Sequence, residues 1–194
     1  KCNFIDEVYV RTDCKKMFQI SKNYEVNLKK LRAKHLSTSK ALTIDVIKNV
    51  ISEKKIKDSY ILLLQATSPF RTLEKTNSFL KKFKKNKNAN SSVSLTRFFH
   101  PHPEKIQIIK KKFVKSYLNK ESMRPRQYLP EVYCLNGLFY IAKSEQLVKK
   151  KSFFSNKTSP FIVKYDQSLN LDLPDDLLIL KDKIKKKIIN QNFL

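Results

Sequence analysis

Apolar residues along the chain form short continuous runs in some places and recur every three or four positions in others. The run 60–64 is unbroken and too short for a typical helix, which predicts a central, parallel strand covered on both faces. The stretch 41–53 carries apolar residues at helical spacing, which predicts an amphipathic helix. The other expected elements are strands at 4–10, 92–96 and 135–142, helices at 14–22, 73–84 and 174–189, and a hairpin at 105–118. This alternation favours an α/β fold with a parallel sheet and helices on both faces.

Two of the expected helices have clear start signals. Thr72 is a candidate N-cap for the helix that begins at residue 73. Pro174 suits the first turn of the last helix, and the aspartates that follow it favour the positive end of the helix dipole. The last helix is expected to bury a stripe made of Leu177, Leu180, Ile184 and Ile188.

The strand at 60–64 ends in a sudden change of polarity. Gln65, Thr67, Ser68 and Arg71 follow its last apolar residue within the sequence LLLQATSPFRT. In open α/β sheets, ligands bind outside the carboxyl ends of the strands. Two interpretations remain open from the residues alone: a ligand-facing strand end, or an ordinary turn in which Thr67 and Ser68 satisfy backbone groups.

The sequence LLLQATSPFRT resembles the LLQPTSPLRT motif of acylneuraminate cytidylyltransferases, the CMP-sialic acid synthetases, with Ala66 where that family has proline. Further matches occur in the family's order: FIDEVYVRTDCKKM (4–17), LRAKHLSTSKALTIDVI (31–47), RQYLPEVYCLNGLFYIAK (126–143), SFF (152–154) and SLNLDLPDDL (168–177). Together they cover nearly the whole chain.

The resemblance implies a fold, a reaction and partners. The fold is that of nucleotide-diphospho-sugar transferases, a three-layer, Rossmann-like α/β domain with a mostly parallel sheet, spanning 1–194. Residues 98–131 match an insertion that serves dimerisation in the family, so a homodimer is expected. The reaction transfers CMP from CTP to a nine-carbon 2-keto sugar acid of the sialic, legionaminic or pseudaminic type and releases pyrophosphate, with Mg²⁺ as cofactor.

The family's glycine-rich loop has no counterpart in this sequence. Members carry a loop of the form GGSKGxxxKN that holds the triphosphate, whereas the one glycine here is Gly137. Backbone amides approach phosphate oxygens most closely where glycine is present. We therefore expect a fragment that lacks half of its nucleotide site and has little or no turnover alone. A natural pseudoenzyme and a noncatalytic assembly subunit are the alternatives.

The resemblance assigns the metal and the nucleotide base to residues of this chain. Asp172 matches the second aspartate of the family's IDID pair and is the expected catalytic metal ligand, while Asn170 occupies the first position with an uncharged amide. A helix cap or a turn residue just before Pro174 is the alternative role for Asp172. Arg32, Ala41 and Thr43 match positions that read cytosine, and a surface role is the alternative for Arg32.

The resemblance also assigns the sugar acid. Gln65, Thr67 and Ser68 are expected to bind its hydroxyl and N-acyl groups, and Arg126 its carboxylate, which arginine binds with two hydrogen bonds. Further positions match the family's pocket lining: Tyr133, Asn136, Phe153 and Phe154. Phe153 and Phe154 suit the core equally well. Arg71 is expected to brace the turn, and Gly137 to permit a close backbone approach or a bulge.

The formal net charge of +24 supports a competing interpretation, a nucleic-acid-binding protein. Lysine-rich runs occur at 81–87, 110–115 and 181–187, but no nucleic-acid-binding motif accompanies them. Abundant lysine, asparagine and isoleucine resemble the product of an AT-rich genome, so no specific nucleic-acid partner is expected. The histidines at 100 and 102 are weak evidence for a metal site, because no third ligand accompanies them.

The remaining composition bounds the class of protein. The length of 194 residues and the hydrophobic content of 41% suit a single core. Three widely spaced cysteines indicate reduced thiols. No apolar run approaches the length of a membrane span and no signal peptide pattern is present, so we expect a cytoplasmic protein without a membrane partner.

Overall fold

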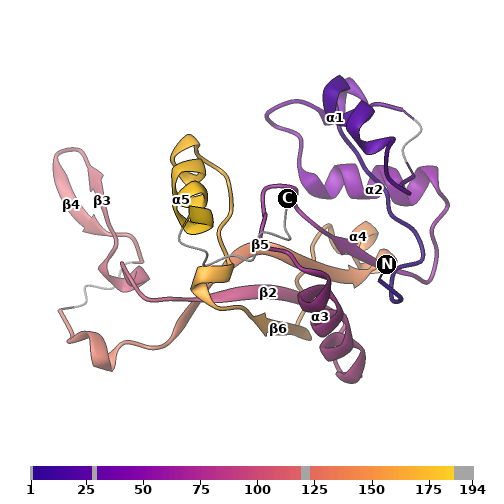
Figure 1. Ribbon diagram of the computed structural model, residues 1–194. Coiled ribbons are helices and arrows are strands. Elements are labelled where there is room, and N and C mark those ends of the chain that lie inside the picture. The colour runs from indigo at the N-terminus through magenta and orange to yellow at the C-terminus, as the bar shows by residue number, and fades with distance from the viewer. Residues whose placement is uncertain (1, 28–29, 119–122, 186–194) are drawn as a thin grey trace. The chain divides into compact units, whose positions relative to one another are not determined.

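The computed structural model describes residues 2–27, 30–118 and 123–185. The α-helices and 3₁₀-helices (η) are α1 (Lys15–Ser21), η1 (Lys34–Leu36), α2 (Thr43–Glu53), α3 (Leu73–Lys85), η2 (Pro103–Lys105), η3 (Arg126–Tyr128), α4 (Ser144–Lys150), η4 (Tyr165–Gln167) and α5 (Pro174–Lys185). The strands are β1 (Tyr60–Leu63), β2 (Ser91–Phe98), β3 (Gln107–Lys110), β4 (Phe113–Ser116), β5 (Val132–Lys143) and β6 (Thr158–Ile162) (Figure 1). Among these residues no helix is long and apolar enough to cross a membrane.

The chain divides into two compact units. The first comprises Lys1–Leu64, Arg71–Val93 and Phe139–Ser159, and the second comprises Gln65–Phe70, Ser94–Leu138 and Pro160–Leu194. The boundary falls within β2, β5 and β6, so each of these strands contributes to both units. The expected insertion, 98–131, lies in the second unit.

Four strands form one mixed sheet in the order β1-β5-β2-β6. β1 pairs antiparallel with β5, from Tyr60 opposite Lys143 to Leu63 opposite Tyr140. Contacts between β2 and β6 increase in residue number together along both strands, from Ser92 Oγ donating to the Ser159 carbonyl to the Val163 amide donating to the Leu95 carbonyl. That is the sense of a parallel pair. The expected α/β class with a sheet that contains parallel strands is therefore confirmed.

The position expected for the strand at 60–64 is wrong. β1 stands at the end of the strand order and pairs antiparallel, rather than lying centrally among parallel strands. Tyr60 is 49% exposed and the rest of β1 is half-buried. The Tyr60 ring packs edge-on against the Phe83 ring of α3, with 5.2 Å between the ring centroids. A continuous apolar run predicts a strand but does not distinguish an edge from a centre.

Two further expectations fail near the ends of the chain. The segment 4–10 forms no regular strand and makes one isolated parallel bridge, Tyr9 to Asn27. The stripe expected on the last helix is not buried, because no residue of α5 is buried and Leu177 is 49% exposed. Ile188 lies outside the described residues. In both segments, apolar spacing indicates a potential face but does not supply a partner to cover it.

The core of the first unit is built on α3 and the end of β5. Phe79 is fully buried and stacks on Phe139, with 4.9 Å between the ring centroids. Thr72 caps α3 as expected, because its side chain accepts a hydrogen bond of 3.0 Å from the Lys75 amide. Arg71 lies over the Phe139 ring at 5.9 Å, and burial lowers the pKa of its guanidinium. Arg71 therefore packs against the core of the first unit, and its role in bracing the turn stays a prediction.

The expected hairpin is confirmed in the second unit. β3 and β4 pair antiparallel from Gln107 opposite Ser116 to Lys110 opposite Phe113. Figure 1 shows this pair as an arm beyond the end of β2. The connecting Lys111 and Lys112 both have positive φ, of 49° and 69°, which matches a tight two-residue hairpin turn.

Replacing the cap of α3 should lower stability without changing the fold. Thr72→Ala removes the acceptor for the Lys75 amide and should reduce the free energy of unfolding by about 1 kcal/mol. Chemical denaturation followed by circular dichroism measures this loss. Thr72→Ser keeps the hydroxyl and should retain most of the stability. Equal losses in both variants would contradict the capping role.

Candidate functional site

Polar side chains from separate segments converge on Gly137 within the second unit. The backbone at Gly137 has a φ of +74°, a conformation that favours glycine. A Cβ atom at this position would lie 2.6 Å from Gln65 Oε1, 3.0 Å from Ser68 Oγ and 3.3 Å from Asn170 Oδ1. Gly137 therefore supplies the close backbone approach that its isolation in the sequence suggested, and it stands where three polar groups meet.

Hydrogen bonds tie the segment after β1 to the segment before α5. The buried Ser68 hydroxyl donates to Asn170 Oδ1 at 3.0 Å, and the Leu171 amide donates to the Thr67 carbonyl at 2.8 Å. The Ser68 side chain thus serves a side chain 102 positions away, which the ordinary-turn interpretation did not anticipate. Motifs that were separate in the sequence form one cluster.

Asp172 joins this cluster through Asn170. Asn170 Nδ2 donates to Asp172 Oδ2 at 2.6 Å. Helix α5 is capped by another carboxylate, because Asp176 Oδ2 accepts from the Asp172 and Leu173 amides at 2.8 and 2.7 Å. Asp176, and not Asp172, therefore fills the capping role that was the alternative for Asp172.

The cluster offers a limited set of metal ligands. No group of three or more His, Cys, Asp or Glu side chains in the described residues has the arrangement of a metal site. The Asn170 amide oxygen already accepts from Ser68, which leaves Asp172 as an exposed carboxylate. Mg²⁺ commonly uses one or two carboxylates together with water and substrate phosphates, so a one-carboxylate site suits this ion.

Asn136 lies beside Gly137 but is 5% exposed. Its Oδ1 accepts from Ser94 Oγ at 2.5 Å and from the Leu138 amide at 3.2 Å, and its Nδ2 donates to Thr96 Oγ1 at 3.0 Å. Sequence reasoning selected Asn136 but missed Ser94 and Thr96. The signal available was a set of hydroxyl residues on an otherwise buried strand, β2.

A second set of polar side chains surrounds the start of β5. Glu131 pairs with Arg97 at 2.6 Å and accepts from the Tyr133 hydroxyl at 2.9 Å. This hydrogen bond, and then desolvation and the negative charge of Glu131, raise the pKa of Tyr133. Arg126, in η3, donates to the Phe99 carbonyl at 2.5 Å. Sequence reasoning missed Arg97, near the end of β2, and Glu131, just before β5, because no motif marks either residue.

His102 has a structural role. Its Nδ1 accepts from the Glu104 amide at 3.2 Å, and its Nε2 lies 3.1 Å from the Pro130 carbonyl. A ring with both nitrogens engaged and 8% exposure is not available as a metal ligand.

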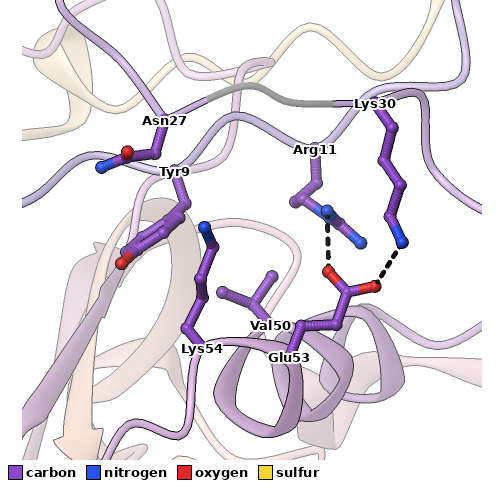
Figure 2. Close-up of a pocket in the computed structure, with 7 residues that line it drawn as sticks. All are labelled: Tyr9, Arg11, Asn27, Lys30, Val50, Glu53 and Lys54. Atoms are coloured by element: carbon purple, nitrogen blue, oxygen red, sulfur yellow. Dashed lines mark ion pairs between the residues drawn. The ribbon is translucent and has the colours of Figure 1, made fainter.

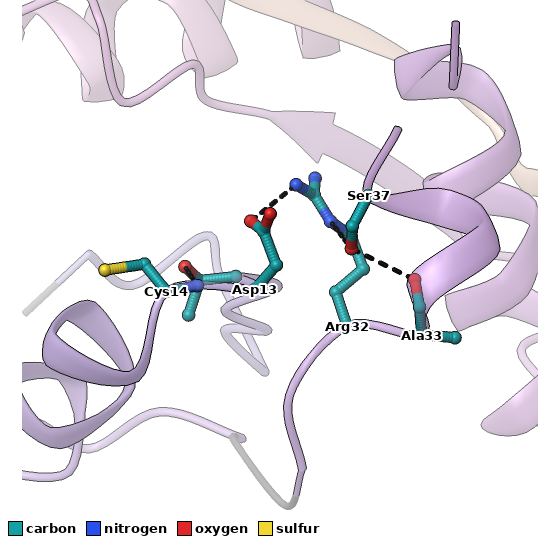
Figure 3. A network of polar contacts seen from close by, with 6 residues as sticks. Asp13, Cys14, Arg32, Ala33 and Ser37 are labelled. Carbon is teal, nitrogen blue, oxygen red and sulfur yellow. Dashed lines mark hydrogen bonds and ion pairs between the residues drawn. The ribbon is translucent and has the colours of Figure 1, made fainter. Parts of the chain in front are cut away.

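In the first unit, Arg32 is held by several contacts, shown in Figure 3. Its Nη2 pairs with Asp13 at 2.7 Å and its Nε donates to Ser37 Oγ at 3.2 Å, while Ser37 Oγ donates to the Ala33 carbonyl. Arg32 is thus oriented rather than loose on the surface. Two other residues are expected to read the base. Ala41 is half-buried, and Thr43 is exposed at the first position of α2.

The paired aromatics differ in environment. Phe153 is 9% exposed and its ring lies 5.5 Å from that of Tyr140, so Phe153 belongs to the core of the first unit. Phe154 is 48% exposed. Of the two, Phe154 is the side chain that a ligand can reach.

A cavity of about 310 Å³ lies in the first unit (Figure 2). Its lining residues are Tyr9, Arg11, Asn27, Lys30, Val50, Glu53 and Lys54. Glu53 pairs with Arg11 at 3.2 Å and with Lys30 at 3.0 Å. The hydrogen bond from Lys30 is the main reason that the pKa of Glu53 is lowered. The carboxylate thus neutralises cations that would otherwise attract an anion here.

Comparison with known proteins gives consistent names. No family model matches the chain. It is 28% identical to a CMP-N,N'-diacetyllegionaminic acid synthase of Legionella pneumophila, over 88% of this chain and 75% of that protein. It is 24% identical to an N-acylneuraminate cytidylyltransferase of Streptococcus agalactiae, over 89% of this chain and 41% of that protein. The resemblance to CMP-sialic acid synthetases is confirmed. Such proteins are nucleotidyltransferases, which is the class that the chain resembles.

Two further comparisons extend the result. The chain is 26% identical to the post-translational flagellin modification protein B of Campylobacter coli, over 93% of this chain and 77% of that protein. In structure it is similar to CMP:2-keto-3-deoxy-manno-octonic acid synthetase complexed with CTP, with a TM-score of 0.64 over 96% of this chain and 84% of that one, at 12% identity. This likeness confirms the expected nucleotidyltransferase-type fold.

The convergence at Gly137 predicts that a side chain there is not tolerated. Gly137→Ala combines a positive φ with a 2.6 Å approach to Gln65 Oε1, and should lower the free energy of unfolding by about 2 kcal/mol. Adding Gln65→Ala removes the closest clash and should restore part of that loss. Denaturation curves of the single and double variants measure both effects. Unchanged stability in Gly137→Ala would contradict the arrangement.

Proposed function

We propose that the protein is a cytidylyltransferase that transfers CMP from CTP to a nine-carbon 2-keto sugar acid of the sialic, legionaminic or pseudaminic type and releases pyrophosphate. The observation that supports this most is the convergence of Gln65, Ser68 and Asn170 on Gly137, with Asp172 bonded to Asn170. These residues come from separate segments that all resemble the family's motifs, and they form one polar cluster.

This polar cluster is suited to a polyhydroxylated ligand. Gln65 and Thr67 offer both donors and acceptors, and Thr67 is exposed. Arg126 is exposed in η3 and supplies the guanidinium for the sugar carboxylate. Tyr133, which is 42% exposed, supplies a face against which an N-acyl group packs. A substrate oriented in this way has its anomeric hydroxyl fixed for attack at the α-phosphorus.

Asp172 is the proposed ligand for Mg²⁺, which when bound neutralises the charge that develops on the departing pyrophosphate. The hydrogen bond from Asn170 Nδ2 orients the Asp172 carboxylate before any ion arrives. The Asn170 oxygen is a weaker candidate as a ligand, because Ser68 already donates to it. We therefore assign Asp172 the direct contact and Asn170 the orientation.

For the base, Arg32 donates to the ring carbonyl of cytosine and the Ala41 main-chain carbonyl accepts from its exocyclic amine, with Thr43 beside them. The pair with Asp13 and the bond to Ser37 hold the Arg32 side chain in one orientation. A fixed guanidinium binds more tightly than a mobile one, because less conformational entropy is lost on binding.

We propose a homodimer formed through the β3–β4 arm. Apolar side chains on this arm are strongly exposed: Ile109 at 82%, Phe113 at 71% and Val114 at 68%. Exposed apolar side chains gathered on one element are typical of an interaction site. A second copy of the chain is the partner that the resemblance implies.

The proposed reaction predicts pyrophosphate release from CTP by the protein translated from the whole coding sequence. Mg²⁺ and one of neuraminic, legionaminic or pseudaminic acid should be required, and the release is measured with a coupled phosphate assay. Asp172→Asn should lower kcat by about a hundredfold or more. Asp175→Asn, which changes an exposed carboxylate in the first turn of α5, should have little effect. Release unaffected by Asp172→Asn would contradict the role given to Asp172.

Failure with all three sugar acids would count against the proposed reaction. The 194-residue chain alone should show little turnover, because its one glycine is committed at Gly137. If the whole protein dimerises but neither binds CTP nor releases pyrophosphate, a noncatalytic assembly subunit becomes the better interpretation.

The proposed dimer predicts that a charge on the arm causes dissociation. Phe113→Lys should convert the protein to a monomer, because burying an unpaired charge costs about 3 kcal/mol. Sedimentation velocity measures the change. Met17→Lys places the same charge at a half-exposed position of α1 and should leave the dimer intact. A wild-type protein that is monomeric would contradict the proposed dimer.

A further inference from the structure

The amide of Asn136 is already engaged by protein groups. Its oxygen accepts from the Ser94 hydroxyl and the Leu138 amide, and its nitrogen donates to the Thr96 hydroxyl. Ser94 is fully buried, Thr96 is 2% exposed, and Asn136 itself is 5% exposed. A side chain in this position has little capacity left for a ligand.

The bond from the Leu138 amide to Asn136 Oδ1 encloses Gly137. An Asn side chain that accepts from the backbone two residues ahead stabilises a turn-like departure from regular strand geometry. That departure is present here, because Gly137 has a φ of +74° within β5. It brings the backbone at Gly137 to within reach of Gln65, Ser68 and Asn170.

We propose that Ser94 and Thr96 are positioning residues of the sugar-acid site. Their hydroxyls fix the orientation of the Asn136 amide, the amide holds the departure at Gly137, and Gly137 sets the spacing of Gln65 and Asn170. The identity of the ligand rests on the proposed function. In this arrangement Asn136 acts through the backbone of β5 rather than by touching the sugar.

The two hydroxyls have opposite hydrogen-bonding roles. Ser94 donates to the amide oxygen, whereas Thr96 accepts from the amide nitrogen. The Leu138 N–H excludes the flipped amide, which would place the Asn136 nitrogen toward this donor, and the two hydroxyls hold the amide in the remaining orientation. Thr96→Val keeps the side-chain shape but leaves the Asn136 N–H without an acceptor in a buried setting, which is costly. The amide is then expected to turn and release Leu138.

Sugar-acid affinity tests this arrangement. In the whole protein, Thr96→Val should raise the Kd and KM for the active sugar acid by about tenfold, equivalent to about 1.4 kcal/mol. The KM for CTP should stay unchanged, and Thr96→Ser should restore affinity to within about twofold. Ser91→Ala is the matched control, because Ser91 is also fully buried on β2 and its hydroxyl meets Thr158 at 2.8 Å. It should lower the melting temperature without changing the Kd.

A double-mutant cycle separates positioning from direct contact. Asn136→Ala and Thr96→Val should each weaken sugar-acid binding, and their combination should be no worse than Asn136→Ala alone. Additive losses would show that Asn136 contributes a contact of its own, which would overturn the proposal. A Thr96→Val variant that loses CTP and sugar-acid affinity equally would overturn it as well.

Amide hydrogen exchange gives a readout that does not depend on activity. Exchange at Leu138 should accelerate at least about tenfold in Asn136→Ala and Thr96→Val, and remain unchanged in Ser91→Ala. Unchanged exchange at Leu138 in the first two variants would overturn the role of Thr96. If the wild type binds no sugar acid, the proposed function fails, and the exchange rates still decide whether Thr96 controls the backbone at Gly137.

Discussion

The backbone conformation at Gly137 is the constraint on which the candidate site depends. A positive φ in the middle of β5 brings main chain, rather than a side chain, to the point where Gln65, Ser68 and Asn170 converge. The amide of Asn136 stabilises this conformation by accepting a hydrogen bond from the Leu138 amide, so the polar cluster depends on a buried side chain.

In the first unit, ion pairs orient the polar side chains. Glu53 pairs with both Arg11 and Lys30, and Asp13 pairs with Arg32. In a chain with 41 basic and 17 acidic residues, carboxylates are scarce and cations compete for them. The arrangement explains why a cavity lined by three cations is not an obvious anion site, because its carboxylate already serves two of them.

Local patterns predicted which helices, caps and hairpins form better than they predicted which elements pack together. The helix at α2, the cap at Thr72 and the hairpin at 105–118 follow from spacing and turn chemistry, which operate within a few residues. The edge position of β1 and the exposed face of α5 depend on partners far along the chain, which no local pattern specifies. At the site, motif matching selected Gln65, Ser68, Asn170 and Asp172. It passed over Ser94 and Thr96, whose importance comes from the amide that they hold.

The contacts of Asn170 explain how an unusual residue can persist there. Codons for aspartate and asparagine differ by one purine, so a genome that drifts toward A and T exchanges the two residues readily. At a site shielded from water, an amide N–H that replaces a carboxylate oxygen and finds no acceptor is costly. Here it finds Asp172 at 2.6 Å, while the oxygen keeps Ser68 at 3.0 Å. The local hydrogen-bond pattern thus absorbs a common mutational step, and the same step in reverse would return a second negative charge to the site.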